Sequence, residues 1–301
     1  MRSHIIYMKI LVAGATGFVG RRLVRALHDQ NHDVIAFSRS ASEAGFPSGV
    51  EPFEGDFGDP ASLEGMCDDV DVAYYLIHSL TAENFAELDR TYARRFRQRA
   101  STAGVDRVIY LSGISGNERD LSPHLASRRE VEAVLEGGEY ELTVLRAAVI
   151  IGRGSASFRI VDDLTDRLPL MVVPTWVRTP GNPIAVDDAV RYLVRLLSVP
   201  ETRGKIFDIG GPSVLSYEEL LRMTANVKNK RVLIIPVPVL TPELSSHWLR
   251  LTTDVQYRIA RPLAKSMRHP VTVDDDRDLQ NVVPIDQTPI KTAINQALTV
   301  N

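Results

Sequence analysis

The sequence predicts an α/β fold, a doubly wound parallel sheet followed by a smaller, mostly helical C-terminal cap. Strand-like apolar runs alternate with helix-like segments through the first half of the 301-residue chain. A glycine-rich turn follows the first run, and the alternation fades beyond about residue 152. Strands separated so regularly by helices are typical of right-handed crossovers in a parallel sheet with helices on both faces.

The first third of the chain gives three strands and one helix. Residues 10–13 are a short apolar run that ends in the glycine turn, as expected of a buried strand. The pattern of residues 18–30 places apolar side chains on one helix face, and Asn31 is a stop signal. Apolar residues 34–37 predict the second strand, and residues 50–57 predict the third.

The middle of the chain continues the alternation. Residues 72–77 predict a fourth strand, and the helix predicted over residues 83–103 has an inward apolar stripe and ends at Gly104. Residues 107–111 predict the fifth strand. A serine followed by proline begins the next predicted helix, residues 122–136.

The pattern then becomes less regular. Residues 142–145 and 206–209 predict the last two strands of the sheet. Prolines are frequent between residues 152 and 184, which predicts a loop-rich excursion. Asp187 is the predicted N-cap of a helix that reaches Leu197.

The composition favours an enzyme or a small-molecule binder with a sizeable core. Lys and Arg number 35 against 38 Asp and Glu, the net charge is -3, and 44% of residues are hydrophobic. A nucleic-acid binder of this size would normally be basic, and a disordered acidic protein would have more charge and fewer apolar residues. We therefore expect a small-molecule ligand and no nucleic acid.

The strongest motif is the glycine turn Gly14-Ala15-Thr16-Gly17-Phe18-Val19-Gly20 between the first strand and the first helix. Its glycines let the backbone approach a pyrophosphate, and the helix N-terminus offers free N–H groups to that anion. A glycine turn alone can be purely structural, but this one opens an uninterrupted strand–helix–strand series. It therefore predicts a Rossmann-type dinucleotide site.

The end of the second strand predicts NADP(H) rather than NAD(H). An NAD site usually has Asp or Glu there, whereas this chain has Ser38 and Arg39 and no acid before Glu43. A guanidinium can bind a 2′-phosphate in a bidentate fork. The alternative for Arg39 is a solvated loop residue. Asp56, after the third strand, is either an adenine contact or a simple turn residue.

Residues 1–212 are predicted to form the NAD(P)-binding domain, with the excursion at about 152–184 contributing to the cap, and residues 213–301 form a small substrate or cap region. Ligand sites often form between such units. Apolar cap residues could line a pocket there, which favours an apolar or quinone-like substrate. These residues include Trp176, Trp248, Leu249, Leu251 and Tyr257.

The motifs resemble the short-chain dehydrogenase/reductase superfamily, in its extended and atypical branches, over about residues 8–300. Besides the glycine turn, the resemblance rests on Glu54-Gly55-Asp56, Leu111-Ser112-Gly113, Leu145-Arg146-Ala147-Ala148 and Phe207-Asp208-Ile209-Gly210-Gly211. Three further strings look like an NmrA-like subgroup related to the nucleotide-binding accessory subunit of respiratory complex I. They are Tyr75-Leu76-Ile77-His78-Ser79, His124-Leu125-Ala126-Ser127-Arg128-Arg129-Glu130-Val131 and Gly154-Ser155-Ala156-Ser157-Phe158.

The resemblance implies a set of cofactor contacts. Residues of the turn would hold the pyrophosphate, the end of the second strand would face the 2′-phosphate, and the end of the third would face the adenine. The end of the fourth strand would border the nicotinamide ribose, and Ala148 the nicotinamide amide. The implied residues are Gly14, Thr16, Gly17, Phe18, Val19, Ser38, Arg39, Asp56, Phe57, Leu76, His78 and Ala148.

The superfamily's catalytic Tyr and Lys, at positions i and i+4 of one helix face, are replaced here by His124 and Arg128, while Ser112 is present. His124 could transfer a proton, since imidazole titrates at about pH 6.5, and Arg128 could donate to ribose hydroxyls. Alternatively, His124 merely occupies the first helical turn and Arg128 is a surface or ribose-binding charge. Ser112 could donate to a substrate carbonyl or merely end its strand.

Two functions follow from these observations. The first is an NADP(H)-dependent reductase that transfers hydride to a carbonyl or quinone-like apolar substrate. The second is a non-catalytic NADP(H)-binding protein with a structural or redox-sensing role. The lone Cys67 and the lack of a bilayer-length apolar run favour the cytoplasm. We expect no metal site, and consider a homodimer or a peripheral complex as the assembly.

Overall fold

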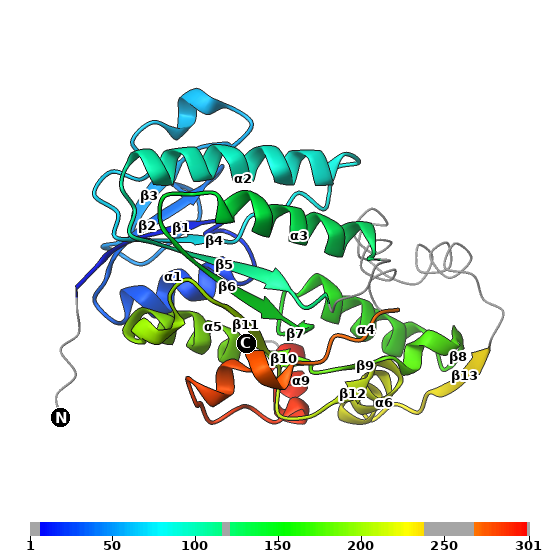
Figure 1. Cartoon of the computed structure of the whole chain (residues 1–301). Helices are drawn as coiled ribbons and strands as arrows, with labels where there is room; N and C mark the ends of the chain where they lie inside the picture. Colours follow the sequence, from blue (N-terminus) through cyan, green and yellow to red (C-terminus); the bar gives the residue numbers. More distant parts are fainter. Residues whose placement is uncertain (1–6, 116–120, 238–267, 300–301) are drawn as a thin grey trace.

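The computed structural model describes residues 7–115, 121–237 and 268–299 and has a seven-stranded parallel sheet at its centre (Figure 1). The strand order is β11-β6-β5-β4-β1-β2-β3. This confirms the predicted doubly wound sheet. Its strands are β1 (Lys9–Ala13), β2 (Asp33–Ser38), β3 (Glu51–Glu54), β4 (Val72–Tyr75), β5 (Arg107–Gly113), β6 (Glu141–Ala147) and β11 (Ile206–Ile209).

The order of the strands reverses between β1 and β4. From β1 the chain winds outward through β2 and β3, whereas β4, β5, β6 and β11 extend in the other direction. In doubly wound sheets ligands bind outside the carboxyl ends of the strands at such a switch point. The fold therefore places the candidate site where β1 and β4 end.

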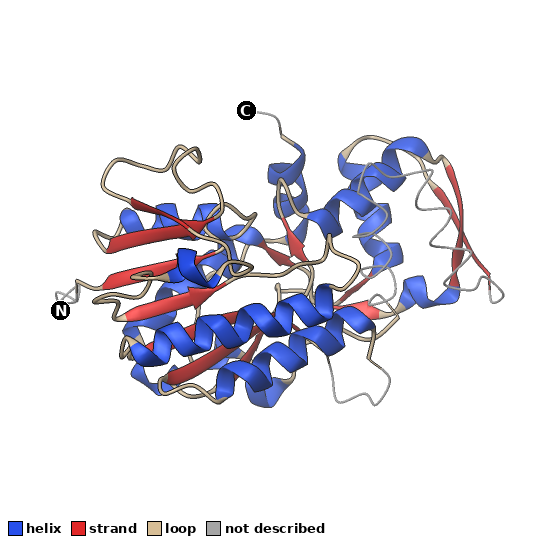
Figure 2. Cartoon of the chain, turned by 90° about the horizontal axis from the view of Figure 1, so that it is seen from above, coloured by secondary structure: helices blue, strands red, loops and turns tan. Residues whose placement is uncertain are grey.

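Helices cover both faces of the sheet (Figures 1 and 2). α1 (Gly20–His28) and α5 (Val186–Arg195) lie on one face, and α2 (Phe85–Thr102) and α3 (Pro123–Glu136) on the other. Alternate residues of a strand point to opposite faces. The residues of β1 follow this rule, because Ile10 and Val12 belong to the cluster under α1, whereas Leu11 and Ala13 belong to the cluster under α2.

The cap has its own apolar core, which confirms the predicted smaller, mostly helical unit. Phe158, Leu220 and Ile294 are buried together there and come from three different helices. These helices are α4 (Ala156–Arg167), α6 (Tyr217–Val227) and α9 (Ile290–Leu298). Short strand pairs complete the cap: β7 (Ile150–Ile151) with β10 (Ile184–Ala185), β9 (Pro180–Gly181) with β12 (Leu215–Ser216), and β8 (Leu170–Pro174) with β13 (Leu233–Val237).

Single turns of 3-10 helix connect several of these elements. They are η1 (Pro60–Leu63), η2 (Thr175–Arg178), η3 (Leu196–Ser198), η4 (Pro200–Thr202), η5 (Asp275–Arg277) and η6 (Leu279–Asn281). No helix within the described ranges is both long and apolar enough to span a lipid bilayer.

Two local predictions were wrong, and one strand was not predicted. The stretch at 152–184 is not mainly loop, because it contains α4 and β8, and the Ser155 hydroxyl caps α4 by accepting from the amide of Phe158. The strand that was not predicted is β13, which follows α6, and its proline is tolerated at the edge of a two-stranded ladder. α5 begins at Val186, so Asp187 lies inside its first turn, where an acid favours the helix dipole.

The predicted division at residue 212 stays a prediction. Three side chains beyond it, Leu279, Val283 and Ile285, pack with the core of the sheet rather than with the cap. Four of the predicted cap residues lie outside the described residues, namely Trp248, Leu249, Leu251 and Tyr257.

Candidate active site

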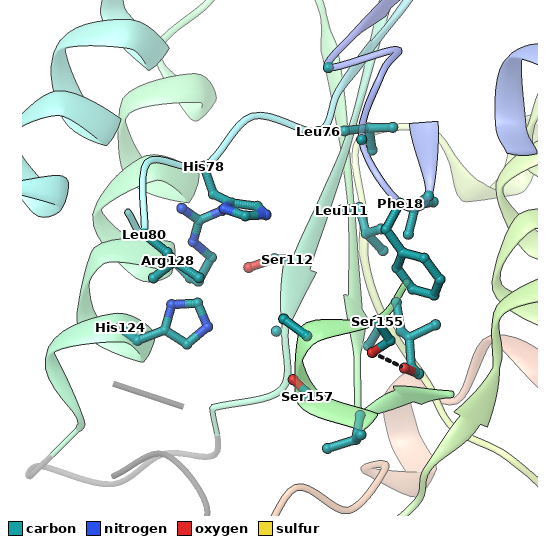
Figure 3. Close-up of a pocket in the computed structure, with 18 of the residues that line it drawn as sticks. Phe18, Leu76, His78, Leu80, Leu111, Ser112, His124, Arg128, Ser155 and Ser157 are labelled. Carbon is teal, nitrogen blue, oxygen red and sulfur yellow. Dashed lines mark hydrogen bonds between the residues drawn. The ribbon is translucent and has the colours of Figure 1, made fainter. Parts of the chain in front are cut away.

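A cavity of about 550 Å³ lies at the carboxyl ends of the central strands, between the sheet and the cap (Figure 3). Its walls come from the glycine turn, from the ends of β4, β5 and β6, and from α3, α4 and α6. Most of the predicted site residues meet there. They are Gly14, Gly17, Phe18, Val19, Arg39, Leu76, His78, Ser112, His124, Arg128 and Ala148.

The glycine turn is shaped by contacts that exclude a side chain. Gly14 has φ +94°, and a Cβ there would lie 3.1 Å from the carbonyl oxygen of Leu76. A Cβ on Gly20 would lie 2.1 Å from the carbonyl oxygen of Gly14, so α1 can start this close to the turn only with glycine. The amides of Phe18 and Val19 find no acceptor among the described residues. Free amides at a helix N-terminus are suited to an anion.

Arg22 fixes the outer edge of this turn and was not singled out from the sequence. It donates through Nη1 to the carbonyl oxygen of Phe18 (2.7 Å) and through Nη2 to that of Arg153 (2.9 Å). Its guanidinium also lies 4.8 Å from the centre of the Phe18 ring. Burial lowers the pKa of Arg22. Arg22 thus joins the turn to the loop before α4.

The residues at the end of β2 differ in exposure. Ser38 is buried, and its hydroxyl accepts from the amide of Ser40 (3.3 Å). Arg39 is exposed and lines the cavity. Thr16 lies in the glycine turn outside the cavity lining, and its carbonyl oxygen accepts from Nε of Arg21 (3.1 Å). The expected roles of these residues toward a cofactor stay predictions.

Asp56 and Phe57, which lie just beyond β3, have structural partners of their own. Asp56 Oδ1 accepts from the amide of Gly58 (2.7 Å), which fits the turn alternative. Phe57 is 3% exposed, and its ring packs against those of Phe37 and Tyr75. Neither residue lines the cavity. The Phe57 side chain therefore packs in the core, and only its backbone atoms would be left to contact an adenine.

Arg128 lies at the base of the cavity and is 5% exposed. Its Nη2 is 2.5 Å from Oδ2 of Asp89 on α2, and its Nη1 donates to the carbonyl oxygen of Ile77 (3.3 Å). Asp89 Oδ1 in turn accepts from the amide of Ser79 (2.7 Å). Arg128 therefore ties α3 to α2 and to the segment after β4. Asp89 was missed from the sequence, although it stands on the inner face of its helix.

Two imidazoles face the cavity beside Arg128 (Figure 3). Burial, then the cationic Arg128 and then His78 lower the pKa of His124 to about 3. His78 is exposed where it opens onto the cavity, and desolvation by the surrounding protein atoms, followed by the cationic Arg128, lowers its pKa to about 4. Desolvation and a neighbouring like charge both disfavour imidazolium. Both rings are thus uncharged at neutral pH, and the ordinary imidazole pKa does not apply to His124.

Ser112 stands at the end of β5 and is 7% exposed. Its Oγ donates to Oε1 of Glu132 on α3 (2.8 Å), and Nη2 of Arg146 on β6 lies 2.6 Å from the other carboxylate oxygen. Glu132 was also missed from the sequence. A sign was available, because Glu132 follows Arg128 by four residues and so shares its helix face.

The opposite wall comes from the start of α4 and from the cap. The Ser155 hydroxyl donates to the carbonyl oxygen of Ile150 (2.7 Å) while it caps α4, so it is occupied within the protein (Figure 3). Much of the remaining surface is apolar. The apolar lining residues include Leu80, Leu111, Ile114, Leu125, Val149, Ile150, Tyr217 and Val271.

Comparisons with known proteins agree with this geometry. The profile of a family described as NAD(P)H-binding matches residues 14–168. The chain is 28% identical over 235 residues to a ceramide reductase of Caulobacter vibrioides, which covers 76% of this chain and 73% of that protein. It is 23% identical over 258 residues to mitochondrial NADH dehydrogenase (ubiquinone) 1 alpha subcomplex subunit 9 of Mus musculus, covering 79% and 66%.

The fold is also found among solved structures. A Citrobacter sp. triphenylmethane reductase complexed with NADP(H) superposes with a TM-score of 0.78 at 21% identity, covering 96% of this chain and 100% of that one. Other solved structures of this fold hold NAD. Identity this low shows a shared fold, and a nicotinamide dinucleotide is the ligand that these proteins have in common.

Proposed function

Since the chain belongs to the NAD(P)H-binding family, we propose that it is a reductase that uses NADP(H) to transfer hydride to a carbonyl or quinone-like apolar substrate. The comparisons confirm the resemblance to atypical short-chain dehydrogenases/reductases and to a complex I subunit. The proposal rests on one observation. A single cavity joins open backbone amides at the glycine turn to Ser112, His124 and Arg128 at the strand ends.

The glycine turn fits the pyrophosphate of the cofactor. The amides of Phe18 and Val19 are open, and Gly14 and Gly20 leave room for the backbone to approach an anion. Arg39 supports NADP(H) over NAD(H), because it lines the cavity at the end of β2, where an NAD site usually has an acid.

When bound, the nicotinamide supplies the hydride. The residues of the chain then orient the substrate and offer hydrogen bonds to its oxygen. Leu111, Ile114 and Leu125 give an apolar surrounding beside Ser112. His124 is uncharged at neutral pH, so it offers an N–H hydrogen bond rather than a proton of its own, and the proton that completes an alcohol comes from solvent.

A second candidate function is the binding of NADP(H) without turnover. The low pKa of His124 makes imidazolium scarce, and Arg128 is already paired with Asp89. A relative is named as an NADH dehydrogenase subunit, which supports a protein partner or homodimer as the setting of such a role. A reducing cytoplasm is consistent with the lone thiol of Cys67, whose pKa burial raises to about 12.

The two candidates differ in turnover. NADPH oxidation is measured over a panel of aromatic ketones and quinones for wild type, Ser112→Ala and His124→Ala, with His28→Ala as the control. We expect oxidation by wild type and the control, about a tenfold or larger loss of kcat in His124→Ala, and a smaller loss in Ser112→Ala, in both variants without loss of NADPH affinity. Tight NADPH binding with no turnover on the whole panel would favour the second function. Absence of binding would contradict both.

A further inference from the structure

The hydroxyl of Ser112 is engaged by a buried side chain of α3. Its Oγ lies 2.8 Å from Oε1 of Glu132, whose side chain is 9% exposed. Ser112 also belongs to the cavity lining. The direction of this hydrogen bond therefore decides what Ser112 can offer to a ligand.

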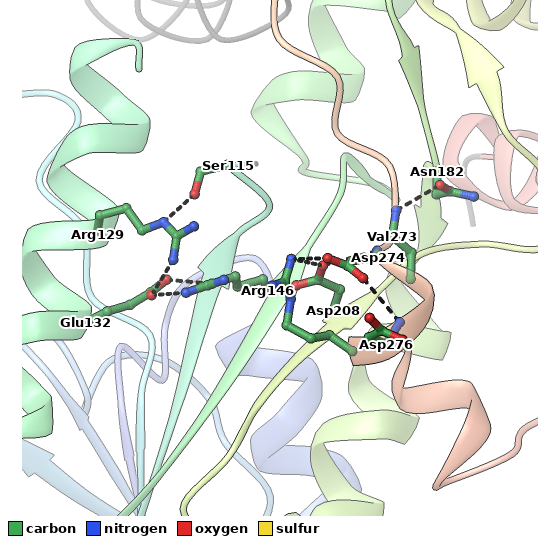
Figure 4. Close-up of polar contacts among 10 residues, drawn as sticks. Ser115, Arg129, Glu132, Arg146, Asn182, Asp208, Val273, Asp274 and Asp276 are labelled. Atoms are coloured by element: carbon green, nitrogen blue, oxygen red, sulfur yellow. Dashed lines mark hydrogen bonds and ion pairs between the residues drawn. The ribbon is translucent and has the colours of Figure 1, made fainter. Parts of the chain in front are cut away.

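Glu132 is surrounded by donors (Figure 4). Arg146 donates through Nε to Oε1 (3.1 Å) and through Nη2 to Oε2 (2.6 Å), and Arg129 donates through Nη1 to Oε2 (3.4 Å). Arg129 is held in turn by Ser115 Oγ, 2.6 Å from its Nε. A carboxylate between guanidinium groups has lone pairs and no proton to offer, so the Ser112 hydrogen has to point at Glu132.

Tyr110 stands two residues earlier on the same face of β5, and its buried hydroxyl finds no hydrogen-bond partner among the described residues. Burial raises the pKa of Tyr110, while the nearby Arg128 and then Ser112 lower it by less. A phenol is a weaker acceptor than a carboxylate. If Tyr110 donates to Ser112, it uses one lone pair of Oγ and leaves the direction of the Ser112 proton unchanged.

We propose that Ser112 acts as a hydrogen-bond acceptor toward the cavity, and that Glu132 is the positioning residue that fixes the direction of the Ser112 proton. The site consequently selects a ligand hydroxyl or N–H group at this position over a carbonyl. This inference rests on the proposed function for its ligand class. It replaces the expectation that Ser112 donates to a substrate carbonyl. A ketone oxygen would turn to the N–H of His124 instead, whereas the alcohol could bind both residues.

The position of one hydrogen tests the proposal directly. Crystals of the full chain are exchanged into deuterium oxide, and neutron diffraction locates the deuterium on Ser112 Oγ. We expect it on the line to Glu132 Oε1. Deuterium directed into the cavity would overturn the proposal. Because no turnover is involved, this result is independent of whether the protein is a reductase.

Ligand preference gives a second test. The probes are acetophenone and 1-phenylethanol, which differ at the oxygen, and their dissociation constants are measured by titration. One hydrogen bond corresponds to roughly a threefold to tenfold preference of wild type for the alcohol. Ser112→Ala should abolish the preference. Glu132→Gln should also abolish it, by strengthening ketone binding, since its amide oxygen has to face the guanidinium groups and its NH₂ then donates to Ser112, whose proton is free to bond a ketone or an alcohol alike.

The control is Glu130→Gln, on the exposed side of α3, where Glu130 is 47% exposed and only 3.6 Å from Arg90. It should keep the wild-type preference. A folded Glu132→Gln protein that still prefers the alcohol would refute the positioning role. If Glu132→Gln fails to fold or neither probe binds, the position of the deuterium on Ser112 Oγ decides whether the proposal stands. A deuterium facing Glu132 in a protein without NADPH turnover would leave this inference standing and reject the reductase.

Discussion

The two ends of the cavity are built in different ways. At the β1–α1 turn the groups that suit a ligand are backbone amides, and they lie within residues 14–20. At the other end they are side chains, and each depends on a partner distant in sequence. Arg128 is separated from Asp89 by 39 residues and Ser112 from Glu132 by 20. A backbone site can therefore be specified locally, whereas a side-chain site requires the assembled fold.

The ends also differ in how electrostatics is arranged. The turn leaves the amides of Phe18 and Val19 open among the described residues, so the partial positive charge at the start of α1 is available to an anion. The guanidinium of Arg128 is already neutralised by Asp89, and its neighbours His78 and His124 are uncharged at neutral pH. The glycine turn can therefore bind an anion. The side-chain end is nearly neutral and can offer directed hydrogen bonds.

The sharpest way to break the backbone end is Gly20→Ala. Its Cβ would stand 2.1 Å from the carbonyl oxygen of Gly14, so the backbone has to move. We expect a loss of about 4 kcal/mol in the free energy of unfolding, and loss of NADPH binding. Denaturant unfolding and NADPH titration measure the two effects.

Gly104→Ala is the matched control for that variant. Gly104 has φ +73°, but a Cβ at this position would have no atom within 4 Å, and the residue lies after α2, away from the cavity. The strain of a left-handed alanine should cost about 1 kcal/mol, and NADPH affinity should not change. Equal loss of binding in both variants would show that the turn is not the cofactor site.

The same contrast explains what could be predicted from the sequence. All seven strands of the sheet were predicted, because apolar runs and glycine turns are local signals. The cap was described less well, since β13 depends on pairing with β8 and its proline locally indicates a loop. At the site, the glycine turn was found, whereas Asp89 and Glu132 were missed. Their importance comes from facing Arg128 and Ser112 across the fold, which no local pattern records.

The side-chain end is tested most strongly by Asp89→Asn. Asp89 is 1% exposed and accepts from Arg128, Ser127 and the amide of Ser79. Removal of one partner of a buried ion pair should cost about 3 kcal/mol of unfolding free energy. Thermal and denaturant unfolding measure it.

Glu130→Gln is again the matched control, because the Arg90–Glu130 pair joins the same two helices at the surface. Exposed pairs contribute about 0–1 kcal/mol. A small effect in both variants would contradict the view that this end of the cavity depends on its buried partners. It would also show that α2 and α3 are held together chiefly by apolar packing.

Arg39→Ala distinguishes the contribution of the Arg39 charge to NADPH affinity from that of the glycine turn. Arg39 lines the cavity while exposed at the end of β2, so its loss should leave stability unchanged. We expect a loss of NADPH affinity of roughly 30-fold to 100-fold, with little change for NADH, since one charge-assisted contact would be removed. Arg25→Ala, on the exposed side of α1, is the control. Equal affinity of the wild type for NADPH and NADH would refute the role given to Arg39.

The smallest expected effect concerns the neutral imidazole wall. The folded protein holds the pKa of His124 at about 3, whereas an unfolded chain has the ordinary 6.5. As the pH falls below 6.5, the unfolded state takes up a proton that the folded state refuses, so stability is lost on acidification. His124→Asn should remove about 1–2 kcal/mol of the stability loss between pH 7 and pH 5. Urea unfolding at several pH values measures this difference.

His28→Asn is the control for the pH series, because His28 ends α1 away from the cavity. Its unfolding curves should follow the wild type at every pH. If His124→Asn also follows the wild type, the imidazole of His124 is protonated in the folded protein at mild acid pH. In that case the ring could supply a proton as well as a hydrogen bond. The side-chain end of the cavity would then carry titratable charge, and its contrast with the backbone end would be one of construction alone.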